Sequence, residues 1–509
     1  ARIGLRLTAL APELRALPQS ALRGENVLPQ LARLESEVEQ VDTSLAAIQD
    51  ALDDLPVALI PGEAARRAEA ITELLPQARM AVDTLLAGIR AGEQLLGLEH
   101  PHTLAVFFQN SNEIRATGGF PGSMAFVTGN DGQSEFDFRD IYSFAWQNGT
   151  QFPPPPGFER LADKLHLQDA NYSFHYPDSA ARLRSMLEYT KGGTAETIVA
   201  ISDDLFAALL DAVGPLPLPE TDEQLSGANA SFLLSFVVEA KLGGRHSPKA
   251  VIAEMLPELQ RRVAELPPEQ LTQLIKRAIR EKWVLAHSTD PEVQRFITLL
   301  GIDGAIRSPQ KPDYLAVVSA NVGGNKSDAF LDESLHVASA VALDGKVTNE
   351  LTITRMHTWG EAQANEVQRL LDRYGSGYTA APLMRYILGA GENHSYTQVF
   401  VPAGSELLAV EGIPPEQVIQ EERHGKTVYS FRYPAVAAGR EEAVTLRYRL
   451  PQPLVAAEMF DLYYQHQPGR DQVRVTREVV AEAGIEVTDG AIAGRTLTGD
   501  AVFRAELQR

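Results

Sequence analysis

The spacing of apolar residues changes twice along this 509-residue chain, and the changes divide it into three regions. Near the start, apolar side chains recur every three or four positions, as at Leu31 and Leu34, which predicts helices. In the middle, short strand-like runs alternate with helical stretches, and near the end apolar residues alternate with polar ones. We therefore expect a helical stalk or bundle (1–99), an α/β core domain (100–355) and a β-rich C-terminal domain (356–509).

The strand-like runs define the fold class expected for each region. In the middle region they are separated by helical patterns, which favours a mixed sheet flanked by helices. These runs cover residues 103–108, 123–128, 197–201 and 314–320. In the last region, period-two runs follow one another with turns between them, which favours an antiparallel β-sandwich. These runs cover residues 396–401, 427–432, 443–448 and 460–464.

Charge and cysteine content exclude several functions. The chain has 67 Asp and Glu against 46 Lys and Arg, a formal net charge of -21, whereas a protein that coats nucleic acid needs a basic surplus. It has no cysteine, which excludes disulfides, thiol catalysis and Cys-ligated metal. No apolar run of about 20 residues could cross a bilayer. Because the chain begins at Ala1, we expect a trimmed or mature chain, and its start leaves open whether an anchor preceded it.

The usual enzymatic signatures are absent, and what remains is a set of polar clusters where predicted strands end. Arg115, beside Gly118 and Gly119, can hold a phosphate or carboxylate with its two-pronged guanidinium group. Cations that precede a helix, as at Arg245 and Lys249, suit a polyanion. The alternatives are a structural Arg–Glu pair for the first cluster and a solvated loop for the later one. The candidate residues are Asn110, Glu113, Arg115, Arg139, Asp140, Arg245, Lys249, Asn321 and Lys326.

Several motifs resemble the bacterial domain-of-unknown-function family numbered four-thousand-and-twelve. The similar segments are residues 108–120, Asp169-Ala-Asn171, Asp211-Ala-Val-Gly214-Pro215 and residues 320–328. The resemblance is most specific between residues 104 and 355. It implies a membrane-anchored protein with helices before the core and a β-rich end after it. The family name implies no activity.

A more distant resemblance is to the LytR–CpsA–Psr family, which transfers glycopolymers from a polyprenyl pyrophosphate carrier to the cell wall. The order of elements is similar, and several segments resemble motifs of that family. These segments are Arg115-Ala-Thr-Gly118, Phe138-Arg139-Asp140-Ile141, residues 167–172, residues 210–216 and Gly244-Arg245-His-Ser-Pro-Lys249. Thr117 departs from the pattern, because that family has an acidic magnesium ligand at this position.

The second resemblance implies a phosphotransferase site in a LytR–CpsA–Psr-like α/β core. Arg115, with Arg245, Lys249 and Arg139, would neutralise a pyrophosphate, and Asn110, Asn321 and Lys326 would complete the ligand site. Glu113 or Asp140 would hold Mg²⁺, so Arg115, Asp140 and Glu113 are the catalytic candidates.

The resemblances also imply partners and a location. The implied partner is a polyprenyl-linked glycan or cell-wall polymer, and the implied place is the extracytoplasmic side of the cytoplasmic membrane. Apolar seams along the N-terminal helices could mediate self-association, and no nucleic-acid partner is expected. The alternative function, favoured by Thr117 and the large β-rich end, is a non-catalytic structural or adhesive ectodomain that acts through protein–protein contacts.

Overall fold

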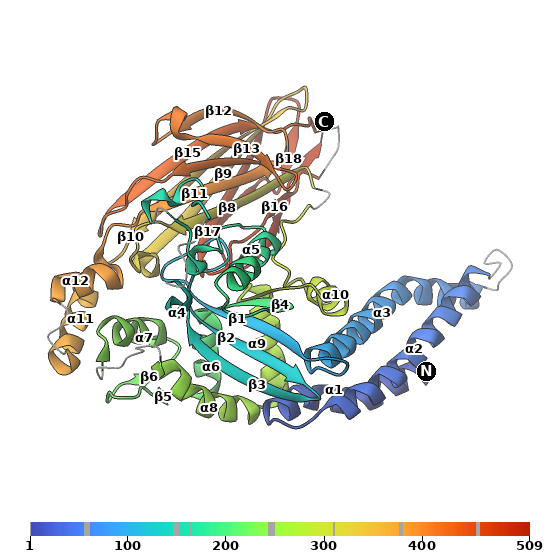
Figure 1. The fold of residues 1–509 in the computed structure, drawn as a ribbon. Helices are drawn as coiled ribbons and strands as arrows, with labels where there is room; N and C mark the ends of the chain where they lie inside the picture. Colours follow the sequence, from blue (N-terminus) through green and yellow to red (C-terminus); the bar gives the residue numbers. More distant parts are fainter. Residues whose placement is uncertain are drawn as a thin grey trace.

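The computed structural model contains three packed parts (Figure 1). The structure describes residues 2–54, 62–145, 152–161, 164–242, 250–308, 311–375, 380–454 and 459–508. It is a mixed α/β protein with helices at the N-terminus and antiparallel-rich sheets in the C-terminal half, as the sequence predicts. Within the described residues, no helix combines the length and the apolar composition that a membrane span requires.

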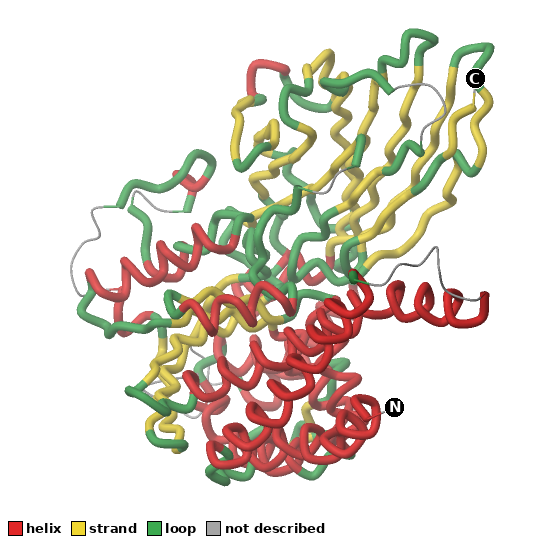
Figure 2. Tube along the Cα trace, turned by 90° about the vertical axis from the view of Figure 1, so that its right-hand side faces the viewer, coloured by secondary structure: helices red, strands yellow, loops and turns green. Residues whose placement is uncertain are grey.

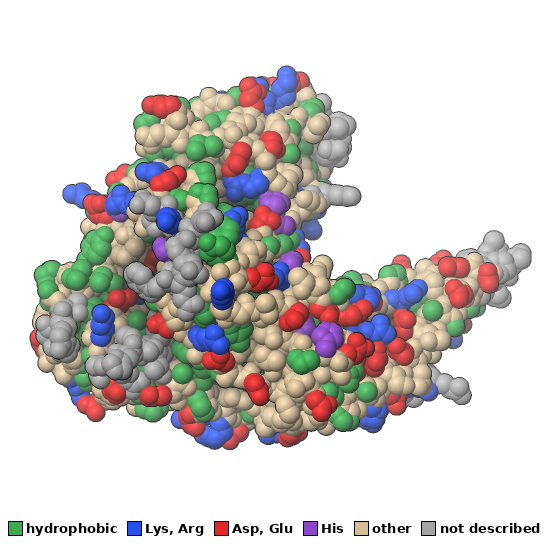
Figure 3. All heavy atoms as spheres, in the orientation of Figure 1, with side chains coloured by type: hydrophobic (Ala, Val, Ile, Leu, Met, Phe, Trp, Pro, Cys, Tyr) green, Lys and Arg blue, Asp and Glu red, His purple; other side chains and the backbone are tan. Residues whose placement is uncertain are grey.

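Three helices form the N-terminal part. They are α1 (Arg2–Leu22), α2 (Leu28–Asp53) and α3 (Gly62–Leu95). The predicted apolar positions of α2, including Leu34 and Val38, are fully buried against α3 residues such as Val82. Figure 1 shows the α2–α3 pair extending away from the rest of the molecule, and Figure 3 shows acidic and basic side chains interspersed along it.

The α/β core contains a five-stranded mixed sheet in the order β3-β2-β1-β4-β7. The strands are β1 (His102–Asn110), β2 (Phe120–Asn130), β3 (Gln133–Asp140), β4 (Thr197–Ser202) and β7 (Val284–Ser288). β1 pairs with β4 in parallel, and the other neighbours are antiparallel. The loop that follows the parallel strand β1 contains the first predicted polar cluster.

Helices cover both faces of this sheet. Helix α5 (Tyr176–Tyr189) packs on one face, where Phe107 and Leu183 belong to the same apolar cluster. Helices α3 and α10 (Pro291–Leu300) cover the other face. A further group of helices packs around its own apolar cluster at one side of the core. These helices are α6 (Asp203–Val213), α7 (Ala230–Glu239), α8 (Ala250–Ala264), α9 (Pro268–Arg280), α11 (Glu361–Tyr374) and α12 (Ala381–Arg385).

Two six-stranded sheets form the C-terminal part and share one apolar core (Figure 2). The first has the order β12 (Glu406–Glu411), β15 (Glu441–Arg449), β10 (Val347–His357), β9 (Leu331–Val341), β17 (Val473–Ala481) and β19 (Ala491–Leu497). The second has the order β13 (Ile419–Arg423), β14 (Lys426–Arg432), β11 (Ser395–Pro402), β8 (Asp313–Asn321), β16 (Leu462–Tyr464) and β20 (Ala501–Phe503). The pairs β8–β16 and β9–β17 are parallel, whereas most other neighbours are antiparallel.

Strand β8 pairs differently from the expectation. We expected residues 314–320 to belong to the α/β core, but β8 pairs with β11 and β16, and β9 and β10 also join the C-terminal sheets. The β-rich part therefore begins at β8. Every residue of β8 is buried, and a fully buried strand lacks the alternation that would identify its sheet from sequence.

The joint between the core and the C-terminal part contains two buried carboxyl groups. Asp204 lies in the first turn of α6, and its side chain hydrogen-bonds with that of Asp471, which precedes β17. Burial and the nearby charges of Asp471 and Asp203 raise the pKa of Asp204 well above its usual value. One proton shared between Asp204 and Asp471 relieves the repulsion between the two carboxylates.

The Asp204→Asn variant is expected to be more stable than the wild type at pH 8, by about 1 kcal/mol. Because the folded-state pKa of Asp204 exceeds its unfolded value of about 3.9, the wild type loses stability as the pH rises through this window. An amide donates the shared hydrogen bond without that proton. Thermal midpoints from pH 4 to pH 8 test this, with the exposed Asp222→Asn variant as control. A midpoint at pH 8 equal to that of the wild type would contradict the prediction.

Candidate functional site

The loop after β1 places Arg115 inside the protein. Its side chain is 1% exposed, and one terminal nitrogen donates to the backbone oxygens of Ile114 and Asn321, at 3.2 and 2.9 Å. The other lies 2.9 Å from a carboxylate oxygen of Glu113 and 3.6 Å from one of Asp169. In this structure the guanidinium group is therefore engaged by protein groups, and its direct contact with an anion stays a prediction.

The two carboxylates beside Arg115 lie close to the surface. The Glu113 side chain is 12% exposed and that of Asp169 is 11% exposed. Burial raises the pKa of Asp169, and the positive charge of Arg115 opposes that shift. Arg115 therefore fixes the direction of two carboxylates that come from separate parts of the chain.

Tyr142 marks the centre of a wider charged cluster. It lies at the start of α4 (Tyr142–Ala145), and its side chain is 43% exposed. Burial and the charges of Glu113, Glu239, Asp169 and Asp140 raise its pKa, so these four carboxylates lie near enough to act on it electrostatically.

A lysine completes this cluster from the C-terminal part. Lys326, in the loop after β8, lies 2.8 Å from Glu239 at the end of α7, and its side chain is 13% exposed. We call Glu113, Arg115, Asp140, Tyr142, Asp169, Glu239 and Lys326 the charged site.

Buried amides hold the loops of the charged site together. Asn321 is fully buried at the end of β8, and its amide donates to Asp328 at 2.6 Å and to the backbone oxygen of Asn325 at 3.1 Å. Asp328 also pairs with Arg470, at 3.2 Å. Asn110 is half-buried and hydrogen-bonds within its loop and to Ser235 on α7. In these contacts both asparagines support the protein frame.

The adjacent glycines also have a structural role here. A Cβ at Gly119 would lie 2.4 Å from the backbone of Asn110. Gly118 also contacts Gly469 in the C-terminal segment. A Cβ added at Gly469 would overlap the carbonyl group of Gly118. These glycines therefore permit close approach of the protein's own backbone, including the C-terminal segment, whereas the sequence suggested the approach of a ligand.

The remaining candidates are not all part of this cluster. Arg139 donates to Asp137 at 2.8 Å and to the backbone of Gly192 at 3.2 Å, and it stacks on the ring of Phe126. Successive residues of a strand point to opposite faces, so Arg139 and Asp140 cannot both face the charged site. Arg245 and Lys249 lie outside the described residues.

The charged site has the donors that Mg²⁺ prefers. Glu113, Asp140 and Asp169 offer carboxylate oxygens, and Mg²⁺ in proteins is usually bound by one or two carboxylates together with waters and substrate phosphates. The oxygens therefore fit this ion in kind. When bound, the ion would supply positive charge that this acidic cluster lacks.

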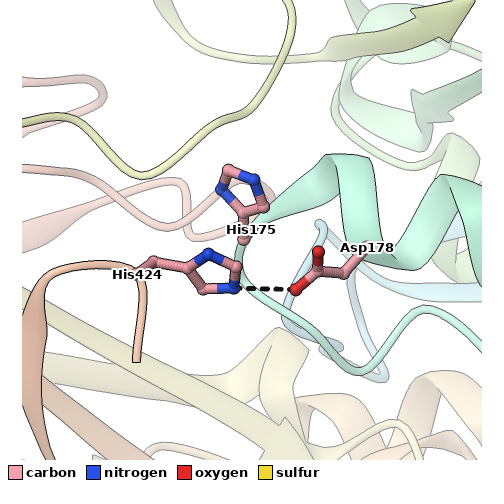
Figure 4. Close-up of side chains that lie close together, drawn as sticks. All are labelled: His175, Asp178 and His424. Carbon is pink, nitrogen blue, oxygen red and sulfur yellow. Dashed lines mark hydrogen bonds and ion pairs between the residues drawn. The ribbon is translucent and has the colours of Figure 1, made fainter. Parts of the chain in front are cut away.

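Away from the charged site, three side chains have ligand atoms close together. Among the described residues, His175, Asp178 and His424 offer atoms within 4.8 Å of one another (Figure 4). The His424 ring lies 2.8 Å from Asp178 and stacks on His175, with centroids 4.0 Å apart. The backbone N–H of Ile306 donates to Nδ1 of His175, at 3.1 Å.

This hydrogen bond argues against a metal at the three side chains. A neutral histidine that accepts at Nδ1 carries its proton on Nε2, so neither nitrogen of His175 offers a free lone pair. Metal-bound histidines instead donate their second N–H. We therefore interpret the three side chains as a contact between α5 and the β13–β14 turn.

Sequence reasoning missed three members of the charged site. Asp169 begins the segment Asp169-Ala-Asn171, which resembles a motif of the family numbered four-thousand-and-twelve. That resemblance could have identified Asp169 as a candidate. Tyr142 follows the candidate Asp140 by two residues. Glu239 lies at the end of an apolar helix, and its pairing with Lys326 depends on a fold that the local sequence does not reveal.

Comparison with known proteins finds a family model that matches part of the chain. Residues 99–236 match the model of DUF4012, described as a protein of unknown function. No curated protein matches the chain.

Two solved structures show weak similarity to the chain. A protein from Streptococcus agalactiae is 11% identical with a TM-score of 0.28, and the match covers 40% of this chain and 74% of that one. A transcriptional regulator from Enterococcus faecalis is 14% identical with a TM-score of 0.24, and the match covers 43% and 78%. The LytR–CpsA–Psr resemblance stays a prediction.

Proposed function

We propose that the charged site binds the diphosphate group of a lipid-linked saccharide together with Mg²⁺, in an extracytoplasmic, membrane-anchored protein of the cell envelope. The observation that carries the proposal is the meeting of charged side chains from distant segments around Tyr142. Partly buried charges cost stability, and within the charged site the pKa values of Asp169 and Tyr142 are raised, as is typical of residues at functional sites.

The net negative charge of the charged site is the reason for including a cation. Four carboxylates face two basic side chains, Arg115 and Lys326, and both of these already have carboxylate partners. Such a site would repel a free diphosphate. Glu113 and either Asp140 or Asp169 would hold Mg²⁺, whose charge attracts phosphate oxygens. Lys326 would turn from Glu239 to the ligand, and Arg115 would keep Glu113 and Asp169 in position.

Binding of farnesyl pyrophosphate, a short soluble polyprenyl diphosphate, tests this proposal by calorimetry. We expect binding with Mg²⁺ and none with EDTA. The Glu113→Gln variant should bind at least tenfold more weakly, because an amide is a poor Mg²⁺ ligand. The exposed Glu350→Gln variant, a matched change on β10, should bind as the wild type does. Equal affinity in EDTA, or in Glu113→Gln, would contradict the proposal.

The alternative function is that of a non-catalytic structural or adhesive ectodomain, and the contacts of Arg115 favour it. Its guanidinium group is used inside the protein, and the adjacent Gly118 supports the C-terminal segment. Incubation with a polyprenyl-pyrophosphate oligosaccharide, an acceptor glycan and Mg²⁺ separates the two functions. Released polyprenyl phosphate would indicate glycopolymer transfer, whereas binding without release would indicate a ligand-binding protein. Absence of both would favour the structural function.

A further inference from the structure

A cavity of ≈ 390 Å³ lies between the α/β core and the second C-terminal sheet. Its walls come from the loop 153–158, from α5, and from strands β8, β11 and β13. Small-molecule sites in proteins commonly measure about 300–1,000 Å³ and often lie between domains. The cavity is thus large enough for one or two sugar rings.

Three aromatic side chains, Phe158, Tyr172 and Tyr396, line this cavity. The rings of Phe158 and Tyr172 lie 6.0 Å apart, and Tyr396 is 7% exposed. The four prolines 153–156 form an apolar edge without any N–H donor. A Cβ at Gly157, whose φ is +92°, would lie against the Tyr396 ring, so this loop is packed directly on it. Phe158 and Tyr396 are thus largely covered, and the half-buried Tyr172 is the ring that can offer a flat face to a pyranose.

The polar groups of the cavity come from both parts of the protein. Gln398 and the Glu421–Arg423 pair come from the second C-terminal sheet, and Arg182 comes from α5. Planar carboxamide, carboxylate and guanidinium groups can make paired hydrogen bonds with neighbouring hydroxyl groups. Glu421 and Arg423 neutralise each other, so the net charge of the lining is that of Arg182.

Arg182 is a cation in the wall of this cavity. Its guanidinium group lies over the rings of Phe152 and Tyr172, at 5.8 and 5.6 Å, and no carboxylate of the described residues pairs with it. The side chain is half-buried. A guanidinium group held flat by aromatic rings is oriented for a carboxylate or phosphate group of a ligand.

The cavity adjoins the charged site. Its wall includes Ala116, which follows Arg115, and Ala320, which precedes Asn321. The Arg115 guanidinium group joins these two segments by donating to the Asn321 backbone oxygen, at 2.9 Å.

We infer that this cavity binds a sugar unit bearing one anionic group. The Tyr172 ring would stack on the sugar, Arg182 would pair with its carboxylate or phosphate, and Gln398 with the Glu421–Arg423 pair would bind its hydroxyl groups. This inference rests on the proposed function in one respect: the sugar would be part of the saccharide carried by the diphosphate. The inference therefore adds that this saccharide is an acidic glycan.

Direct binding of free saccharides tests the inference without a diphosphate. We expect tetragalacturonate to bind at least tenfold more tightly than neutral galactotetraose, and glucose 6-phosphate shows whether phosphate can replace the carboxylate. The Arg182→Ala variant should lose this preference, and Arg182→Lys should keep part of it. Tyr172→Leu should weaken binding of both tetrasaccharides. Arg67→Ala, on the N-terminal helices, is the matched control.

The outcomes separate this inference from the proposed function. Arg182→Ala should leave farnesyl pyrophosphate binding unchanged, and Glu113→Gln should leave tetragalacturonate binding unchanged. Failure of diphosphate binding with intact saccharide binding would overturn the proposed function alone. The inference is overturned if neither acidic ligand binds the wild type, if the neutral tetrasaccharide binds equally well, or if Arg182→Ala binds as the wild type does.

Discussion

Replacement of Arg355 by leucine is expected to lower the free energy of unfolding of the C-terminal part by about 3–5 kcal/mol. Arg355 on β10 is fully buried, and its guanidinium group lies 2.7 Å from Glu333 on β9. It also donates to Ser395 and Thr397 on β11, at 2.7 and 3.1 Å, and so joins the two sheets. The variant leaves a carboxylate without its partner in the core.

The pKa of Glu333 supports the size of this effect. Burial alone would raise the pKa of this carboxyl group, but the guanidinium groups of Arg355 and Arg470 hold it below its usual value. Without Arg355, burial dominates, and Glu333 must either stay charged at high cost or take up a proton.

Thermal unfolding measures the loss, and we expect a fall of about 10 °C or more in the midpoint of this part. The control is the double variant Arg355→Leu with Glu333→Leu, which removes both charges. It should recover part of the loss, because replacing a complete buried pair by apolar groups is often neutral. A double variant no more stable than Arg355→Leu would show that the hydrogen bonds between the sheets, not the ion pair, stabilise this region.

Much of the fold could be predicted because the spacing of apolar residues along the sequence reflects which side chains are buried. The helical spacing of Leu34 and Val38 corresponds to the buried face of α2, and period-two strands such as β15 occur in the C-terminal sheets. The sheet to which β8 belongs could not be predicted, since its pairing with β11 and β16 depends on strands that lie far along the chain.

The candidate site could be predicted only in part, for a similar reason. Polar residues after β1 and β8 stand out in sequence, and the structure brings Glu113, Arg115 and Lys326 into one cluster with Asp140. The sequence does not show that Arg115 would be buried. That follows from the contact between Ile114 and Asn321, whose backbones hydrogen-bond at 2.9 Å. Partners such as Glu239 are likewise set by the packing of α7.

Arg115 is the residue at which stability and the proposed function can be separated. We expect Arg115→Met to lose about 3 kcal/mol or more, because two carboxylates and two carbonyl groups lose their buried donor. Burial already raises the pKa of Asp169 against the effect of Arg115, so the variant raises it further. A raised folded-state pKa removes stability as the pH increases, so the deficit should be larger at pH 8 than at pH 5.

The matched test adds Asp169→Asn and Glu113→Gln to Arg115→Met and compares thermal midpoints at both pH values. Removing the two charges should abolish the difference between pH 5 and pH 8, while part of the loss persists because the carbonyl groups of Ile114 and Asn321 each lose the hydrogen bond from Arg115. A deficit in Arg115→Met that is equal at both pH values would mean that the carboxylates do not depend on Arg115. In that case its role in positioning Glu113 and Asp169 would be wrong, and its contribution would be the hydrogen bonds to the backbone oxygens of Ile114 and Asn321.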